Sequence, residues 1–238
     1  MKILITICAR GGSKGVPGKN IKKINGRPLI DFSIKHAKEF AALPHDVDIA
    51  LSTDSEEIKD TAASCGLMTD YLRPEFLASD TIGKADVLKD ILRYEEEKRQ
   101  KKYDVLLDLD VTSPLRNLDD LKNAFEILLG DKETLNVFSV SKPHKNPYFN
   151  VVELKEDGYC KLVKHSDSLS RQSAPQVYDM NASFYFFRRA FFEQNLKSAL
   201  TEKSKFYLVE HICFDVDEPI DFDIMEYLFT ANKLDFEI

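Results

Sequence analysis

The sequence lacks the features that would direct it into a membrane or a secretory route. No apolar run among its 238 residues approaches the roughly 20 needed to span a bilayer. Residues 3–8 are apolar, but no small-residue cleavage site follows them, so we interpret them as a first β-strand and not as a signal peptide. The four cysteines are scattered, with no CxxC pair and no histidine cluster nearby. We therefore expect a reduced, cytoplasmic protein with buried thiols and no membrane partner.

The chain also lacks an excess of positive charge, although one segment concentrates it. The formal net charge of −7 should repel nucleic acid and anionic lipid, so we expect no nucleic-acid partner. Residues 10–27 nevertheless contain no acidic residue, and their basic residues are Arg10, Lys14, Lys19, Lys22, Lys23 and Arg27. Because this charge surrounds a glycine-rich loop, the pattern favours a small polyanion as ligand.

That loop, "ARGGSKGVPGKN" (residues 9–20), matches neither common phosphate-binding fingerprint. A Walker A loop ending at Gly18-Lys19 needs glycine and a hydroxyl residue where this chain has Ser13 and Asn20. The glycines do not fit the Gly-x-Gly-x-x-Gly spacing of dinucleotide-binding loops either. Backbone N–H groups and cations in such a loop suit the triphosphate of a nucleotide and the charge on a leaving pyrophosphate. A solvated basic turn is the alternative interpretation.

Apolar periodicity predicts strands that alternate with helices. Apolar and β-branched runs predict strands at residues 3–8, 47–52, 68–72, 105–109, 136–141 and 183–187. Helical stripes predict helices that begin near residues 28, 57, 87, 118 and 220. Residues 95–102 read as a solvated charged stretch. The alternation predicts a single α/β domain, residues 1–238, with a Rossmann-like, mostly parallel sheet and helices on both faces.

Residues 142–179 interrupt this alternation. Prolines break the segment, and residues 148–154 and 159–163 read as short antiparallel strands. Apolar residues here, such as Tyr148 and Phe149, need not be buried by one α/β core. We interpret the segment as an excursion inserted in the domain, and we expect it to dock on a second copy in a two-fold homodimer.

The glycine loop resembles the first motif of the CMP-nonulosonate synthetases, the N-acylneuraminate cytidylyltransferase family, which activates sialic acids with CTP. Further motifs follow in the order of that family: "STDSEEI" (Ser52–Ile58), "LRPEFLASD" (Leu72–Asp80), "TSPLR" (Thr112–Arg116), "RQSAP" (Arg171–Pro175), "NASFYFF" (Asn181–Phe187) and "FDVDEPIDF" (Phe214–Phe222). Each motif is weak alone, but together they span almost the whole chain.

The resemblance implies that the anomeric hydroxyl of a keto-sugar acid attacks the α-phosphate of CTP, giving a CMP-sugar and pyrophosphate. It assigns CTP to Arg10, Gly12, Ser13, Lys19, Asn20, Arg73 and Asp80. It assigns the sugar acid to Asp110, Arg171, Gln172, Asn181 and Tyr185. Tyr185 lies in an aromatic run that would also suit the core. The candidate catalytic residues are Arg10, Lys19 and Asp215.

Asp215 and Asp217 are the candidate ligands of Mg²⁺. Carboxylates two residues apart on an extended segment point to the same side. Magnesium prefers such oxygen ligands and completes its shell with water and substrate phosphate oxygens. A pair of solvated loop aspartates is the alternative, but the matching family motif "DVD" favours a metal site.

Three residues depart from the pattern of the sialic acid enzymes. Asp110 occupies the position of a glutamine that contacts the sugar, Lys84 occupies that of a serine, and Asp179 stands near an expected arginine. A carboxylate only accepts hydrogen bonds, so Asp110 would suit a sugar that offers an amide N–H. The chain looks more like the legionaminic acid branch, whose sugar carries a second acylamino group in place of a hydroxyl. Sialic and pseudaminic acid remain open.

Two other functions remain open as well. Another sugar nucleotidyltransferase, such as a Kdo cytidylyltransferase or a molybdopterin-type transferase, lacks the RQ…NASFY combination of this chain. A catalytically silent nucleotide-binding regulator would share the fold, but retention of Arg10, Lys19, Asp215 and Asp217 argues against it.

Overall fold

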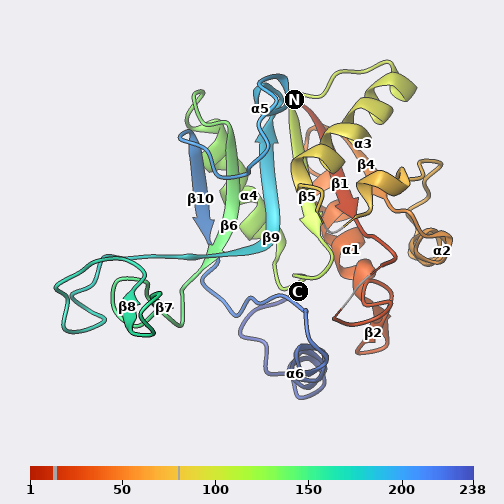
Figure 1. Ribbon diagram of the computed structural model, residues 1–238. Coiled ribbons are helices and arrows are strands. Elements are labelled where there is room, and N and C mark those ends of the chain that lie inside the picture. The colour runs from red at the N-terminus through yellow and green to blue at the C-terminus, as the bar shows by residue number, and fades with distance from the viewer. Residues whose placement is uncertain (13–14, 80) are drawn as a thin grey trace.

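A six-stranded sheet forms the centre of the computed structural model, which describes residues 1–12, 15–79 and 81–238 (Figure 1). Its strands are β1 (Lys2–Cys8), β4 (Asp46–Ser52), β5 (Val105–Asp110), β6 (Asn136–Ser141), β9 (Asp179–Arg188) and β10 (Ser204–Leu208). They lie in the order β10-β6-β9-β5-β1-β4. All neighbours are parallel except β9, which is antiparallel to β5 and β6. The predicted α/β fold with a mostly parallel sheet is confirmed.

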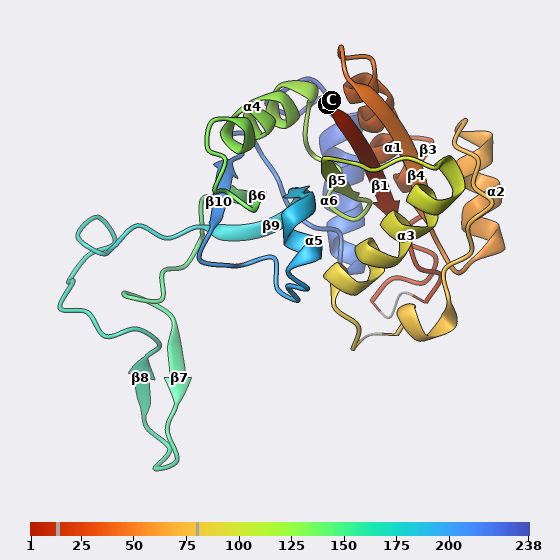
Figure 2. The same ribbon diagram turned by 90° about the horizontal axis from the view of Figure 1, so that it is seen from above.

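Helices cover both faces of this sheet. They are α1 (Leu29–Ala41), α2 (Glu56–Ser64), α3 (Lys84–Arg99), α4 (Leu118–Leu129), α5 (Arg189–Glu193) and α6 (Pro219–Thr230), with a 3-10 turn η1 (Glu75–Leu77). Successive strand residues point to opposite faces. Ile3 and Ile5 therefore pack with Phe40 of α1, whereas Leu4 packs with Leu88 of α3. Figure 2 shows α1 and α4 on one side of the sheet and α3 and α5 on the other.

Capping residues define where two of these helices begin. The Ser55 side chain accepts a hydrogen bond from the backbone N–H of Ile58 at the start of α2. Asn117 forms a reciprocal capping box with Asp120 at the start of α4. Gly66 follows α2 with a φ of +80°, the left-handed conformation that glycine adopts without strain. Local sequence thus fixes the ends of the helices that flank the carboxyl edge of the sheet.

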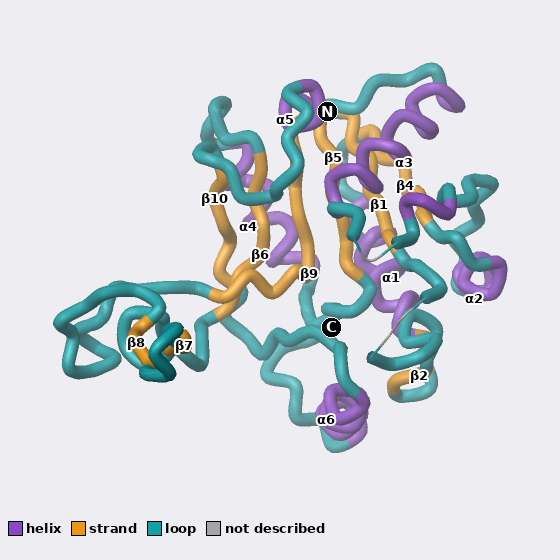
Figure 3. The backbone as a smooth tube through the Cα atoms, in the orientation of Figure 1, coloured by secondary structure: helices purple, strands orange, loops and turns teal. Residues whose placement is uncertain are grey.

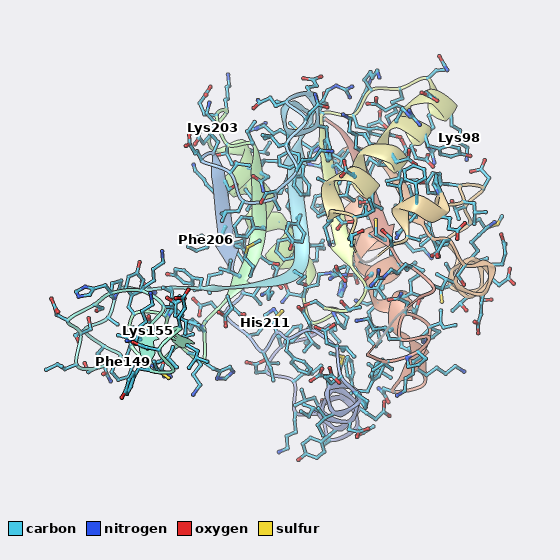
Figure 4. The ribbon with its side chains drawn as sticks, in the orientation of Figure 1. Lys98, Phe149, Lys155, Lys203, Phe206 and His211 are labelled. Carbon is cyan, nitrogen blue, oxygen red and sulfur yellow. The ribbon has the colours of Figure 1, made fainter. Side chains whose placement is uncertain are left out.

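Residues 142–179, here called the arm, leave the sheet after β6 and return at β9 (Figures 1 and 2). They contain the short antiparallel strands β7 (Val152–Leu154) and β8 (Cys160–Leu162), so the predicted hairpin is present. Figure 4 places Phe149 and Lys155 on the arm, away from the sheet. Large apolar side chains of the arm are exposed, among them Leu154 (75%), Tyr159 (72%) and Leu169 (94%). Docking of the arm on a second copy stays a prediction.

One prediction about local structure was wrong, and another holds only in part. Residues 68–72 form no strand but a connection in which Met68 is 80% exposed. Most of residues 95–102 are exposed as predicted, but Glu95 and Glu96 are buried at the end of α3. Both glutamates are paired with arginines, and pairing is what allows a carboxylate to leave water. Periodicity alone does not reveal such partners.

The cysteines and the short elements also differ from expectation. Cys160 is exposed and the other three cysteines are half-buried, so the thiols are less buried than predicted. Sequence analysis missed β10, α5 and the small hairpin of β2 (Lys23–Ile24) and β3 (Arg27–Pro28), which carry too few residues to show a period. Across the described ranges no helix is both long enough and apolar enough to cross a membrane.

Candidate active site

A cavity of about 620 Å³, here called the nucleotide cavity, opens at the carboxyl-terminal ends of β1 and β5. In Figure 3 the loops that follow these strands gather at that lower end of the sheet, where ligands bind in open α/β folds. Among the described residues, its charged lining consists of Arg10, Lys19, Arg73, Lys84, Asp110, Asp217 and Glu218. Cations from separate segments therefore converge on a space of the size that a nucleotide fills.

The glycine loop after β1 forms one wall of this cavity. Asn20 is buried, and its Nδ2 donates to the Arg10 carbonyl oxygen at 2.9 Å, which ties the two ends of the loop together. The Arg10 Nη1 donates to the Ala78 carbonyl oxygen at 3.4 Å. Gly12 is exposed, and no atom of the described residues beyond its chain neighbours lies within 4 Å of where a Cβ would stand. The predicted CTP residues Ser13 and Asp80 lie outside the described residues.

Lys19 and Gly15 hold the loop against the segment that carries the two predicted metal ligands. The Lys19 Nζ donates to Asp217 Oδ1 at 2.9 Å and to the Val216 carbonyl oxygen at 3.1 Å. A Cβ on Gly15 would stand 2.3 Å from the Asp217 carbonyl oxygen, closer than real Cβ atoms approach. This contact requires glycine, because two backbones meet there.

Arg73 is fixed at the opposite wall. Its side chain is buried, with Nε donating to Ser52 Oγ at 2.9 Å and Nη2 to the Ser52 carbonyl oxygen at 2.7 Å. These bonds attach the guanidinium to the end of β4 while it lines the cavity. Arg73 thus presents a positive charge whose position does not depend on a ligand.

Asp110 and Lys84 lie together at the floor of the cavity. Asp110 Oδ2 accepts from Lys84 Nζ at 2.9 Å, and Asp110 Oδ1 accepts from the backbone N and Oγ1 of Thr112, both at 2.9 Å. Burial alone would raise the pKa of Asp110, but Lys84 and Thr112 lower it to about 2. Cys8 lines the same cavity, and burial with the nearby Asp108 charge raises its thiol pKa to about 12. Asp110 is therefore ionised and Cys8 is not a nucleophile.

A second cavity of about 470 Å³, here called the amide cavity, is lined by Asp215, two residues before Asp217 of the nucleotide cavity. Asn181 and Asp215 line it, and Asn181 is only 5% exposed. Within the described part of the chain, Asn181 Nδ2 and Asp215 Oδ1 are buried without a hydrogen-bond partner. Burial, with the charges of Asp110 and Asp217 adding to it, raises the pKa of Asp215 to about 6. An unpaired donor and an unpaired acceptor in one cavity are suited to a polar ligand that completes them.

Tyr185 lies in the core rather than in either cavity. It is 7% exposed, its ring is nearly parallel to that of Phe187 at 5.9 Å, and it is not among the described lining residues of either cavity. Its link to the site is indirect, because the Lys84 Nζ stands 4.7 Å from the centroid of its ring.

Arg171 and Gln172 lie on the arm, and a single chain does not bring them to Asp110. They line a third cavity of about 350 Å³, where an Arg171 Nη2 donates to the His144 carbonyl oxygen. Lys142 lines both this cavity and the amide cavity, so the two adjoin. The sugar residues predicted from the sequence are thus divided between the sheet and the arm.

Asp215 and Asp217, the two predicted ligands of Mg²⁺, line different cavities. Asp215 lines the amide cavity, while Asp217, with its side chain 68% exposed, lines the nucleotide cavity. The partnerless buried oxygen of Asp215 fits a cation ligand. Over the ranges the structure describes, no group of three or more His, Cys, Asp or Glu could hold a metal. The remaining ligands would have to be phosphate oxygens and water, the pattern that Mg²⁺ favours.

Sequence reasoning noted Lys84 only as a departure and missed its partner Asp108. Asp108 is fully buried and accepts from Lys84 Nζ at 2.8 Å. The alternation "DLD" at the end of β5 was an available signal, because it places Asp108 and Asp110 on the same face of the strand.

Together, the fold and site define an enzyme class: a mostly parallel sheet, a basic glycine loop at its carboxyl edge and a buried carboxylate oxygen without a partner in the described chain are the parts of a nucleotidyltransferase. The comparison with protein families identifies the family within this enzyme class. The chain belongs to the family described as Cytidylyltransferase, whose model matches residues 4–233. The resemblance inferred from the motifs is confirmed at this level.

Individual relatives extend the likeness over the whole chain. The sequence is 42% identical over 233 residues to the "Post-translational flagellin modification protein B" of Campylobacter coli, covering 98% of this chain and 97% of that protein. It is 39% identical, with the same coverage, to the "CMP-N,N'-diacetyllegionaminic acid synthase" of Campylobacter jejuni. Among solved structures it is similar to CMP:2-keto-3-deoxy-manno-octonic acid synthetase complexed with CTP, with a TM-score of 0.71 over 98% of this chain and 100% of that one. The identity there is 16%, so that likeness shows the fold alone.

Proposed function

We propose that the protein transfers CMP from CTP to the anomeric hydroxyl of a nonulosonic acid of the legionaminic acid type, releasing pyrophosphate. The observation that carries this proposal is that one short segment contributes a lining residue to each of two cavities. Asp217 lines the cationic nucleotide cavity, and Asp215, two residues earlier, lines the amide cavity. The relative from Campylobacter jejuni, named for a diacetyllegionaminic acid product, supports this choice of sugar.

The residues of the chain divide the reaction between these cavities. Arg10 and Lys19, beside the glycine loop, bind the triphosphate and stabilise the charge that grows on the leaving pyrophosphate. Asn181 offers its unpaired N–H to the sugar acid in the neighbouring cavity. Holding both substrates in these cavities lets the anomeric oxygen attack the α-phosphorus as the bond to pyrophosphate breaks.

We also propose Mg²⁺ as the cofactor, with Asp215 and Asp217 as its ligands. The unpaired Asp215 oxygen and the exposed Asp217 carboxylate support this assignment. When bound, the ion would neutralise phosphate charge and orient the substrates. Lys19 now neutralises Asp217, so its contact at 2.9 Å is the one that metal binding would exchange.

Assembly and location complete the proposal. We propose one domain, residues 1–238, whose arm docks on a second copy, because the arm exposes large apolar side chains and carries Arg171 and Gln172 away from its own sheet. Each arm would then supply these two residues to the sugar site of the partner. The unpaired cysteines agree with a cytoplasmic location.

Pyrophosphate release is the test of the proposed function. The protein should release pyrophosphate with CTP, Mg²⁺ and a nonulosonic acid, and far more slowly when UTP or ATP replaces CTP. The sugar panel should contain legionaminic, pseudaminic, sialic and Kdo-type acids, which separates the proposal from other cytidylyltransferases. Turnover with Kdo alone, or with UTP as fast as with CTP, would contradict it. Light scattering at micromolar concentration should give the mass of a dimer.

A further inference from the structure

Lys84 binds three groups at once on the floor of the nucleotide cavity. Its Nζ donates to Asp108 Oδ2 at 2.8 Å and to Asp110 Oδ2 at 2.9 Å, and lies 4.7 Å from the centroid of the Tyr185 ring. An ammonium group has three hydrogens. Two of them are engaged by carboxylates of the described chain, so Lys84 is held as the shared partner of Asp108 and Asp110.

The sheet itself builds this cluster. Asp108 and Asp110 are two residues apart on β5, so their side chains share one face. Tyr185 of β9 stands directly opposite Asp108 in the strand register. Lys84 is the first residue of α3, the helix that covers this face. Three elements therefore meet at one ammonium group.

Asp108 makes the position of Lys84 obligatory. Its carboxylate is fully buried and accepts from Thr6 Oγ1 at 2.9 Å as well as from Lys84. A carboxylate so far from water needs a paired cation. The ammonium group is therefore held in place before any substrate arrives.

Asp110 keeps one acceptor position for a ligand. A carboxylate offers about four lone-pair directions. Thr112 occupies two of them on Oδ1, and Lys84 occupies one on Oδ2. The Asp110 side chain is 20% exposed and lines the cavity. The remaining lone pair on Oδ2 is the acceptor that a substrate can reach.

We propose that Lys84 is a positioning residue, which orients this acceptor of Asp110 towards a donor on the part of the sugar acid that enters the nucleotide cavity to reach the α-phosphate, and so sets the preference for an acylamino N–H over a hydroxyl. The proposal rests on the proposed function and deepens it. Lys84 also offsets one of two neighbouring carboxylates, which reduces their repulsion of a sugar that is itself an anion.

The test must separate positioning from folding. Lys84→Met alone leaves Asp108 buried without its cation and is expected to lower stability. The double variant Lys84→Met/Asp108→Asn removes the cation and the buried charge together and keeps an acceptor for Thr6. Lys84→Arg restores a charge at the same place. Lys89→Met changes an exposed lysine of the same helix that does not line the nucleotide cavity and serves as the matched control.

The measured quantities are kcat/KM for N,N'-diacetyllegionaminic acid and for N-acetylneuraminic acid, the KM for CTP, and the melting temperature. We expect the folded double variant to lose roughly tenfold or more of its preference between the sugars. Its KM for CTP should change by less than about threefold, because the charge of Lys84 is already offset by Asp108 and Asp110. Lys84→Arg should recover part of the preference, and Lys89→Met should match the wild type.

Two results would overturn the proposal. One is a folded double variant with an unchanged sugar ratio, and the other is a loss confined to the KM for CTP. Both require an active wild type. A wild type that releases no pyrophosphate with either sugar would instead refute the proposed function, and the role of Lys84 with it.

Discussion

The two ends of the central sheet differ in how completely their buried polar groups are paired. At the amino-terminal end, Asp48 of β4 accepts from Arg99 at 2.7 Å, from Lys101 at 2.6 Å and from the Tyr103 hydroxyl at 2.8 Å. Glu96, on the neighbouring helix, accepts from Lys102, from the backbone of Tyr103 and from Arg189. The carboxylates at this end are surrounded by donors from their own chain.

At the carboxyl-terminal end, Lys84 pairs with Asp108 and Asp110, but other buried polar atoms are left without partners. Asp215 Oδ1 and Asn181 Nδ2 find none in the described part of the chain. An unpaired buried group costs stability, which a fold tolerates where a ligand supplies the missing bond. We infer that the paired charges at the amino end stabilise the fold and that the unpaired atoms at the carboxyl end serve the reaction. Substitutions at the two ends should therefore separate stability from activity.

The largest expected effect is on turnover, from Asp215→Asn. Removing one ligand of Mg²⁺ should lower kcat by about a hundredfold or more, the scale of several kcal/mol that a metal contributes. The melting temperature should not fall, because the wild-type carboxylate oxygen has no partner in the described chain to lose. Kinetics and thermal unfolding of the same preparation check both statements.

Asp223→Asn is the matched control for this variant. Asp223 is an exposed aspartate on α6, and its loss should change neither quantity. Chelation of the metal should bring the wild type down to the level of Asp215→Asn. Near-normal turnover in Asp215→Asn would mean that Asp215 is not a metal ligand.

The next largest expected effect is on stability and not on turnover, from a substitution at the amino-terminal end of the sheet. Glu96→Ala removes a buried carboxylate and leaves Arg189 without its main partner. Breaking such a pair costs about 3 kcal/mol of unfolding free energy. Turnover per folded molecule should stay at the wild-type level, since Glu96 does not line the nucleotide cavity. Urea unfolding together with kcat at low temperature measures both; a large loss of kcat would show that the two ends are coupled.

Much of the fold and part of the candidate site could be predicted from the sequence. The rest depends on contacts between residues far apart in the chain. Strand and helix periods predicted the sheet, and the resemblance to the cytidylyltransferases pointed to Arg10, Lys19 and Asn20, all of which line the nucleotide cavity. Burial of Glu96 depends on Arg189, a residue 93 positions away, and no local pattern contains that information. Tyr185 packs in the core, the alternative that the sequence left open, because its neighbour on the same strand face, Phe187, is aromatic.

A smaller effect is expected from Gly15→Ala in the glycine loop. The new Cβ would overlap the Asp217 carbonyl oxygen, so the loop must shift by enough to cost about 1–3 kcal/mol. Lys19 donates to the side chain of the same Asp217, so a shift of the loop should also move Lys19. The KM for CTP should therefore rise more than kcat falls. Gly12→Ala, where a Cβ meets no atom of the described residues beyond its chain neighbours within 4 Å, should have a clearly smaller effect. Equal effects of the two substitutions would show that the close approach is not what matters.

The smallest expected effect is a dependence of stability on acid pH that originates at the amino end. Burial alone would raise the pKa of Glu96, but hydrogen bonds from Arg189 and Lys102 lower it below its usual value. The unfolded chain therefore binds the proton more tightly, and the stabilisation is complete above the unfolded pKa of about 4.3. It is lost as the pH falls through the lower pKa of the folded state.

Glu96→Gln tests this origin, because glutamine resembles the protonated acid at every pH. The wild type should melt at a higher temperature than Glu96→Gln near pH 7, and the difference should shrink steadily below about pH 4.3. Thermal unfolding of both proteins between neutral and acid pH gives this difference directly. Burial alone would raise the pKa of Asp48, but hydrogen bonds from Lys101 and Tyr103 lower it below its usual value. Both proteins should therefore still lose stability in acid. A difference that stays constant with pH would mean that Glu96 stabilises the fold by its shape and not by its charge.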